Sequence, residues 1–222
     1  MFRIKICGVT TVDDAKAAVE LGADILGLNF FAQSPRYVTI AHALEIAAQT
    51  PCTAGVFVNE AAAKVSQVAA EVGLDWVQLH GDEPAELLAD INDELPIIRA
   101  RTLSSQGLVG VLDDLLACER AGRLPDAVLI DATVPGQYGG TGKTVDWAAL
   151  DDHNELLREI PLILAGGLTP GNVNQAITTV MPAAVDTASG VEASPGVKDV
   201  EKMRSFIQAA KLSFGTAERG VE

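Results

Sequence analysis

Residues 21–29, LGADILGLN, contain the pattern on which the fold depends. Gly22 falls where a helical pattern ends, and glycine is preferred there because it adopts a left-handed backbone readily. An apolar segment follows at once and ends on the polar Asn29. Residues 72–80, VGLDWVQLH, repeat the same order around Gly73 and end on His80. Each stretch predicts a joint at which a helix ends and a strand begins.

Outward from these joints, apolar segments of strand length alternate with amphipathic helical patterns along the chain. The predicted strands are residues 2–7, 24–29, 53–58, 75–79, 96–100, 126–131, 161–165 and 183–187. Helical stripes lie between them. Four of these stripes are Val65, Val68, Ala69 and Val72; Leu108, Val111, Leu112 and Leu115; Val173, Ala176, Ile177 and Val180; and Met203, Phe206, Ile207 and Ala210.

Eight strands, each followed by a helix, favour an α/β fold of one (β/α)8 TIM barrel, with a parallel eight-stranded sheet inside a ring of outer helices. The alternative is a doubly wound open sheet, which usually carries a glycine-rich phosphate loop after its first strand. Residues 7–10, CGVT, do not match that fingerprint. We expect residues 1–212 to form the catalytic barrel domain and residues 213–222, which show no periodicity, to be a frayed tail.

The composition narrows the possible partners. The 222 residues carry a net charge of −14, which argues against binding to nucleic acid or to an anionic membrane. No apolar run approaches the roughly 18 residues that a membrane span needs, and the N-terminal MFRIKICG lacks the layout of a signal peptide. We therefore expect a cytoplasmic protein. The three cysteines share no short spacing, so the sequence indicates neither a metal site nor a redox pair.

Polar residues gather at the carboxyl ends of the predicted strands, where barrels of this type place their active sites. They are Cys7, Asn29, Asn59, His80, Asp131, Asp186 and Ser189. Because side chains alternate along a strand, an inward Cys7 predicts inward Lys5 and Arg3, with Ile4 and Ile6 facing the helices. The same reasoning points Trp76, Gln78 and His80 inward from the fourth strand, with Val77 and Leu79 outward. It points Leu129 and Asp131 inward from the sixth strand, with Val128 and Ile130 outward.

Two glycine-containing turns, Gly166-Gly167 after the seventh strand and Ser189-Gly190 after the eighth, suit a phosphate site. Barrels frequently bind phosphate with these two loops, through backbone N–H groups and a helix N-terminus. The alternative is that they are ordinary turn glycines. If the substrate is an anion, its pocket must be locally positive in this acidic chain.

Residues 139–144, GGTGKT, look like a nucleotide-binding P-loop. That motif requires a glycine five positions before Gly142, and Gln137 stands there. We interpret the segment as an active-site loop, and residues 132–145 as a candidate lid.

At these positions the sequence resembles the phosphoribosylanthranilate isomerase family of tryptophan biosynthesis. The resemblance rests on KICGVT at 5–10, GLNFFAQSPRYV at 27–38, GVFVN at 55–59, VQLHGDEP at 77–84, the stretch 131–147 that begins with Asp131 and ends in YGGTGKTVDW, AGGLTPGNV at 165–173 and DTASGVEASPGVKD at 186–199. It implies an Amadori rearrangement of a small anionic substrate, phosphoribosyl anthranilate, with Cys7 as general base and Asp131 as general acid. It also implies that Arg36 lies near the anthranilate end and that Gly166, Gly167, Ser189 and Gly190 hold the phosphate. Many members carry serine where this chain has Ala188, which removes one side-chain hydroxyl from the phosphate loop.

The chemistry requires one acid to open the sugar ring and one base to take a proton from the neighbouring carbon, but no metal or other cofactor. Lys5, on the same strand face as Cys7, is a candidate cation to lower the pKa of the thiol. Asp131 must carry a proton when it acts, and Asp186 could be its neighbouring carboxylate or could orient the imine nitrogen.

Other readings stay open. His80 could contact substrate or make a structural hydrogen bond, and Arg36 could bind a substrate carboxylate or pair with an acidic residue. The chain could be a related phosphate-binding barrel of tryptophan or histidine biosynthesis, although a histidine-pathway isomerase would be expected to carry aspartate at the position of Cys7. It could also be a non-catalytic barrel that binds a metabolite. We expect a monomer or a homodimer.

Overall fold

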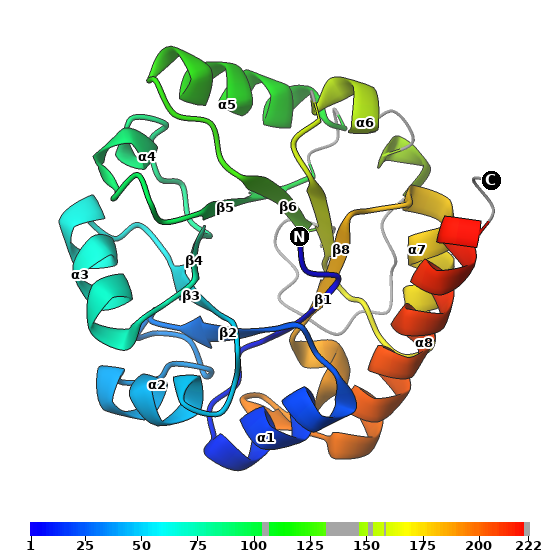
Figure 1. Ribbon diagram of the computed structural model, residues 1–222. Coiled ribbons are helices and arrows are strands. Elements are labelled where there is room, and N and C mark those ends of the chain that lie inside the picture. The colour runs from blue at the N-terminus through cyan, green and yellow to red at the C-terminus, as the bar shows by residue number, and fades with distance from the viewer. Residues whose placement is uncertain (104–106, 132–146, 151–152, 158, 220–222) are drawn as a thin grey trace.

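The computed structural model describes residues 1–103, 107–131, 147–150, 153–157 and 159–219. Eight parallel strands form a closed barrel in the order β1 to β8 (Figure 1). They are β1 (Ile4–Cys7), β2 (Ile25–Asn29), β3 (Thr53–Phe57), β4 (Trp76–Leu79), β5 (Ile97–Thr102), β6 (Ala127–Asp131), β7 (Leu162–Ala165) and β8 (Ala184–Thr187). Because β1 pairs with both β2 and β8, the sheet has no edge. The predicted barrel is confirmed and the open sheet is excluded.

Helices surround the barrel on its outside (Figure 1). They are α1 (Val12–Leu21), α2 (Ile40–Ala47), α3 (Ala62–Val72), α4 (Leu87–Asp90), α5 (Val109–Arg120), α6 (His153–Leu156), α7 (Val173–Val180) and α8 (Val200–Arg219), with short 3-10 helices η1 (Trp147–Leu150) and η2 (Ser189–Val191). Gly22 and Gly73 end α1 and α3 in left-handed conformations, with φ of 95° and 75°, as the joints predict. No helix among these described segments is both long and apolar enough to cross a membrane.

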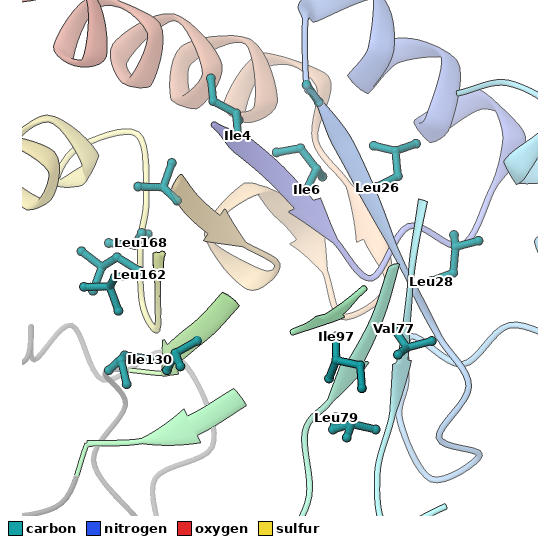
Figure 2. Close-up of a cluster of buried hydrophobic side chains, with 14 of the residues drawn as sticks. Ile4, Ile6, Leu26, Leu28, Val77, Leu79, Ile97, Ile130, Leu162 and Leu168 are labelled. Carbon is teal, nitrogen blue, oxygen red and sulfur yellow. The ribbon is translucent and has the colours of Figure 1, made fainter. Parts of the chain in front are cut away.

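The core consists of two layers separated by the wall of the barrel. Outward side chains pack against the helices, and Figure 2 shows Ile4, Ile6, Val77, Leu79 and Ile130 among them. Inward side chains form a second, smaller cluster, which contains Leu129 and packs against Trp76. The inside and outside assignments predicted for β4, for β6 and for Lys5 in β1 therefore agree with the structure.

Arg3 does not follow the predicted alternation. It precedes β1, so no strand pairing fixes its side chain, and its guanidinium lies 5.1 Å from the centre of the Phe214 ring in α8. It also donates a hydrogen bond to the carbonyl of Ala183. Arg3 thus covers the outside of the barrel bottom, and the prediction that it faces inward is wrong.

The last helix continues beyond residue 212, where we expected the fold to end. Ser213 is fully buried and bonds Asn174 of α7, while Phe214 is 7% exposed. Helix α8 packs against both α7 and α1, so it joins the last part of the ring to the first. The buried face of α8 continues at the same spacing from Ala210 to Ser213 and Phe214, but a polar serine at one of these positions conceals the apolar stripe in the sequence.

Three aspartates connect consecutive strands at the amino-terminal end of the barrel. Asp24, Asp75 and Asp126 each stand directly before an even-numbered strand. Their carboxylates accept hydrogen bonds from backbone N–H groups of Ile4, Thr53 and Ile97, respectively, at 2.8 Å each. Each carboxylate therefore satisfies a donor at the start of the preceding strand, which would otherwise lack a protein acceptor.

This arrangement predicts a local loss of stability when one carboxylate is removed. Asp126→Ala should lower the free energy of unfolding by about 1–2 kcal/mol, because the Ile97 N–H loses its acceptor. Asp126→Asn, which keeps a side-chain oxygen, should lose less. Urea unfolding followed by circular dichroism measures both, with the exposed Asp113→Ala on α5 as control. An equal loss in Asp126→Ala and Asp113→Ala would contradict the assignment.

Candidate active site

The polar strand ends meet at the carboxyl-terminal mouth of the barrel. Cys7 ends β1, His80 follows β4, Asp131 ends β6 and Asp186 lies in β8. These residues are distant in the chain but share one mouth, because all eight strands are parallel.

Lys5 and Asp186 form a buried ion pair between the first and last strands. The Lys5 side chain has no exposed surface, and its Nζ lies 3.0 Å from Asp186 Oδ1. The two residues are also directly paired in the β1–β8 register. Burial alone would lower the pKa of Lys5, but Asp186 and Cys7 outweigh it and the pKa is raised. Lys5 therefore remains a cation beside Cys7.

Two opposing effects shift the pKa of the Cys7 thiol. Burial raises its pKa, whereas the charges of Lys5 and Lys198 lower it, and the net pKa is raised. The predicted effect of Lys5 has the right sign, but it does not overcome the burial of the sulfur. The thiol is thus mostly protonated at neutral pH and strongly basic when ionised.

Two glycines make room around Cys7. A Cβ atom on Gly27, the β2 residue paired with Cys7, would lie 2.8 Å from the Cys7 sulfur and 3.0 Å from Lys5 Nζ. Gly8 has a φ of +69°, and a Cβ there would collide with the side chain of Arg36. Small residues are therefore required both beside the thiol and beneath the arginine.

His80 and Asp131 approach each other across the mouth. His80 Nε2 lies 3.9 Å from Asp131 Oδ2, too far for a hydrogen bond but close enough for electrostatic interaction. Gln78 Nε2 lies 2.6 Å from His80 Nδ1, so with the amide as donor the ring proton is on Nε2 and faces Asp131. The pKa of His80 is lowered, because desolvation by the surrounding protein outweighs the charge of Asp131, which would raise it. This holds although 37% of the side chain is exposed. His80 is therefore a neutral imidazole with a structural hydrogen bond on one side.

Asp186 accepts a hydrogen bond from the Lys5 ammonium, which offsets its charge. Its suggested roles, as the carboxylate beside Asp131 or as the group that orients the imine nitrogen, stay predictions.

Glu83, which the sequence reasoning missed, holds the loop that carries His80. Its buried carboxylate accepts hydrogen bonds from the N–H groups of Asn59 and Gly81, at 2.9 and 3.0 Å. Arg101 donates to the carbonyl of Gly81 at 3.1 Å. The only signal in the sequence is an acidic residue soon after a polar strand end, which is too common to identify such a role.

Arg36 pairs with an acidic residue, one of the two alternatives left open above. Its Nε and Nη2 atoms donate to the two carboxylate oxygens of Glu192, both at 2.7 Å. Lys198 Nζ also donates to Glu192 Oε1, at 2.9 Å. Burial would raise the pKa of Glu192, but the hydrogen bonds from Arg36 and Lys198 reverse this, so its pKa is lowered and it is a carboxylate at neutral pH.

Glu192 and Lys198 belong to a short antiparallel hairpin that the sequence did not predict. Its strands are β9 (Glu192–Ser194) and β10 (Val197–Lys198), too short for a periodic pattern.

The loops after β7 and β8 touch each other, as the predicted phosphate site requires. A Cβ on Gly190 would collide with the carbonyl of Leu168, which also accepts a 2.8 Å hydrogen bond from Thr187 Oγ1. Gly166 and Gly167 have φ of 86° and 65°, values that other residues rarely adopt. Ser189 begins η2, a helix of only three residues. The glycines therefore permit both the backbone turn and the close approach of the two loops.

A family model for N-(5'-phosphoribosyl)anthranilate (PRA) isomerase matches residues 4–209. The chain belongs to the N-(5'-phosphoribosyl)anthranilate isomerase family. It is 45% identical to the isomerase of Geobacter sulfurreducens over 95% of this chain and 99% of that protein. The crystal structure of phosphoribosyl anthranilate isomerase from Thermotoga maritima has 40% identity and a TM-score of 0.84, over 95% of this chain and 99% of that one. A structure of phosphoribosyl anthranilate isomerase in complex with reduced 1-(o-carboxyphenylamino)-1-deoxyribulose 5-phosphate has 38% identity and a TM-score of 0.80, with the same coverage.

The P-loop-like segment 139–144 and the candidate lid 132–145 lie outside the described residues.

The space that Gly27 leaves beside the Cys7 sulfur can be tested by filling it with a methyl group. Gly27→Ala should lower isomerase turnover by about a hundredfold, because a displacement of about 1 Å at a reacting group can cost that much. Steady-state kinetics measures the loss, and circular dichroism shows whether the barrel is retained. Gly73→Ala, whose Cβ would meet nothing within 4 Å, is the control for glycine replacement and should affect stability alone. Wild-type turnover in Gly27→Ala would show that the thiol does not need this space.

Proposed function

We propose that the chain catalyses the Amadori rearrangement of N-(5'-phosphoribosyl)anthranilate to 1-(o-carboxyphenylamino)-1-deoxyribulose 5-phosphate, the isomerisation of tryptophan biosynthesis. The observation that carries the proposal is the placement of Cys7 and Asp131 at one barrel mouth in a chain of this family. A cytoplasmic location and a monomeric or homodimeric state remain predictions.

Asp131 is the proposed general acid. It delivers a proton to the oxygen of the sugar ring, the bond from that oxygen to the anomeric carbon breaks, and the amine nitrogen becomes a cationic imine. The carboxyl group is 30% exposed, so a substrate can reach it from the mouth. Neutral His80 has its Nε2 atom 3.9 Å from the same carboxylate and is a proposed substrate contact.

Cys7 is the proposed general base. As a thiolate it removes the proton from the carbon next to the imine, and the resulting enol rearranges to the ketone. Its raised pKa limits the thiolate fraction at neutral pH but makes each thiolate a stronger base. Lys5 offsets part of the cost of the buried negative charge, and the carboxylate of Asp186 is a proposed contact for the substrate's amine.

The two ends of the substrate have separate proposed contacts. Glu192 occupies one edge of the Arg36 guanidinium, and the other edge would serve the anthranilate carboxylate. Gly166, Gly167, Ser189 and Gly190 would hold the phosphate through their backbone N–H groups. Ala188 supplies no hydroxyl there, so the proposal relies on the main chain at this position.

Loss of either reacting group should reveal its role. Cys7→Ser and Asp131→Asn should each lower turnover by about 10²- to 10⁴-fold, the usual scale for general acid–base groups. The assay generates fluorescent phosphoribosyl anthranilate in situ and follows loss of its signal after enzyme is added.

Cys52→Ser is the matched control, because Cys52 is a half-buried thiol that precedes β3 at the opposite end of the barrel. It should retain wild-type turnover. Near-normal activity in Cys7→Ser or Asp131→Asn would overturn the assignment of that residue.

A further inference from the structure

Lys198, at the end of the β9–β10 hairpin, has a side chain with no exposed surface. Its Nζ donates to three acceptors: the carbonyl of Cys7 at 2.6 Å, the carbonyl of Ala188 at 3.1 Å and Glu192 Oε1 at 2.9 Å. Three simultaneous donations require the three N–H bonds of an ammonium group. These acceptors favour the ammonium form, whereas burial lowers the pKa of Lys198 and Glu192 opposes that effect.

The two carbonyls belong to adjacent strand ends. The β1–β8 pairing continues through Lys5 with Asp186 and Ile6 with Thr187, and the next residues along the two strands are Cys7 and Ala188. At this position the ammonium of Lys198 bonds both carbonyls. It therefore connects the backbone of the proposed base to the proposed phosphate loop.

The hairpin that carries Lys198 is itself tied to the mouth. Thr10 Oγ1, in the loop after β1, donates a 2.7 Å hydrogen bond to the carbonyl of Gly196 at the hairpin turn. Glu192, in the other strand of the hairpin, holds Arg36. These contacts fix the hairpin on the same side of the barrel as Cys7.

We propose that Lys198 is a positioning residue, which fixes the backbone of Cys7 and places a positive charge beside it that stabilises its thiolate. The proposal rests on the proposed role of Cys7 as general base. In this proposal Lys198 acts indirectly, through its hydrogen bonds to the carbonyl of Cys7 and to the carboxylate of Glu192.

The charges facing Cys7 come from several elements. Lys5 lies on β1, Asp186 on β8, Arg36 after β2 and Lys198 on β10. The charges of Lys5 and Lys198 lower the pKa of the thiol, and that of Asp186 raises it. Loss of Lys198 should therefore raise the pKa of Cys7 further, and one unit of rise reduces the thiolate fraction about tenfold.

The test compares Lys198→Met with Lys202→Met. Lys202 is the matched control because its ammonium also bonds the hairpin, at the carbonyl of Glu192, but it is exposed and makes no bond to Cys7 or Ala188 among the described residues. The first readout is the rate at which iodoacetamide alkylates Cys7 between pH 6 and pH 10, with peptide mass analysis to separate Cys7 from Cys52 and Cys118. The second is kcat and KM of the isomerisation.

In Lys198→Met we expect Cys7 alkylation at pH 7 to slow about three- to tenfold, its pH midpoint to rise, and kcat to fall at least as much. In Lys202→Met both rates should stay within about twofold of wild type. A folded Lys198→Met protein with the wild-type alkylation profile would overturn the proposal.

If Lys198→Met does not fold, Lys198→Gln removes the same charge but keeps a hydrogen-bond donor at this position. Alkylation of Cys7 at pH 7 should again slow about three- to tenfold, and a wild-type alkylation profile overturns the proposal. Alkylation needs no substrate, so this outcome is independent of the activity. Failure of the proposed function would instead appear as an inactive wild type or an active Cys7→Ser.

Discussion

A lysine that is completely removed from water must have its charge compensated, and in this barrel the compensation comes from the opposite end of the chain. Lys5 of β1 meets Asp186 of β8 only when the sheet closes. An unpaired charge in this position would cost several kcal/mol, so the open form of the sheet is disfavoured. Cys7 and Gly27 then fit around this pair, with the thiol beside the ammonium.

The mouth places cations and carboxylates side by side in a chain of net charge −14. Lys5, Arg36 and Lys198 all lie near Cys7, although Asp186 and Glu192 balance much of their charge. These carboxylates hold the cations in fixed positions. Each cation therefore presents its positive charge in a fixed direction. Such preorganised charge suits the proposed reaction, with a Cys7 thiolate as base and an anionic sugar phosphate as substrate.

The barrel and the inside or outside position of most strand residues could be predicted because both follow from short repeating patterns. Alternation along β4 and β6 is a property of consecutive residues, and the glycines that end α1 and α3 meet a local requirement of the backbone. Cys7, His80 and Asp131 could be placed at the mouth for the same reason. The pairing of Arg36 with Glu192, the contacts of Lys198 and the burial of Ser213 depend on residues far apart in the chain. No local pattern records such contacts, so the sequence left Arg36 ambiguous and missed the hairpin.

The aspartates before β2, β4 and β6 also bear on the order in which the barrel can assemble. Each joins strands that are neighbours in the chain, so its hydrogen bond links residues only 20 to 29 positions apart. The eighth strand has Ala183 in the corresponding position, and its contacts with β1 require nearly the whole chain. Strand pairs can therefore form early, whereas the seam between β8 and β1 is the entropically expensive step. Because Lys5, Cys7 and Lys198 all lie along that seam, the Cys7 thiol acquires its surroundings only when the last part of the chain has docked.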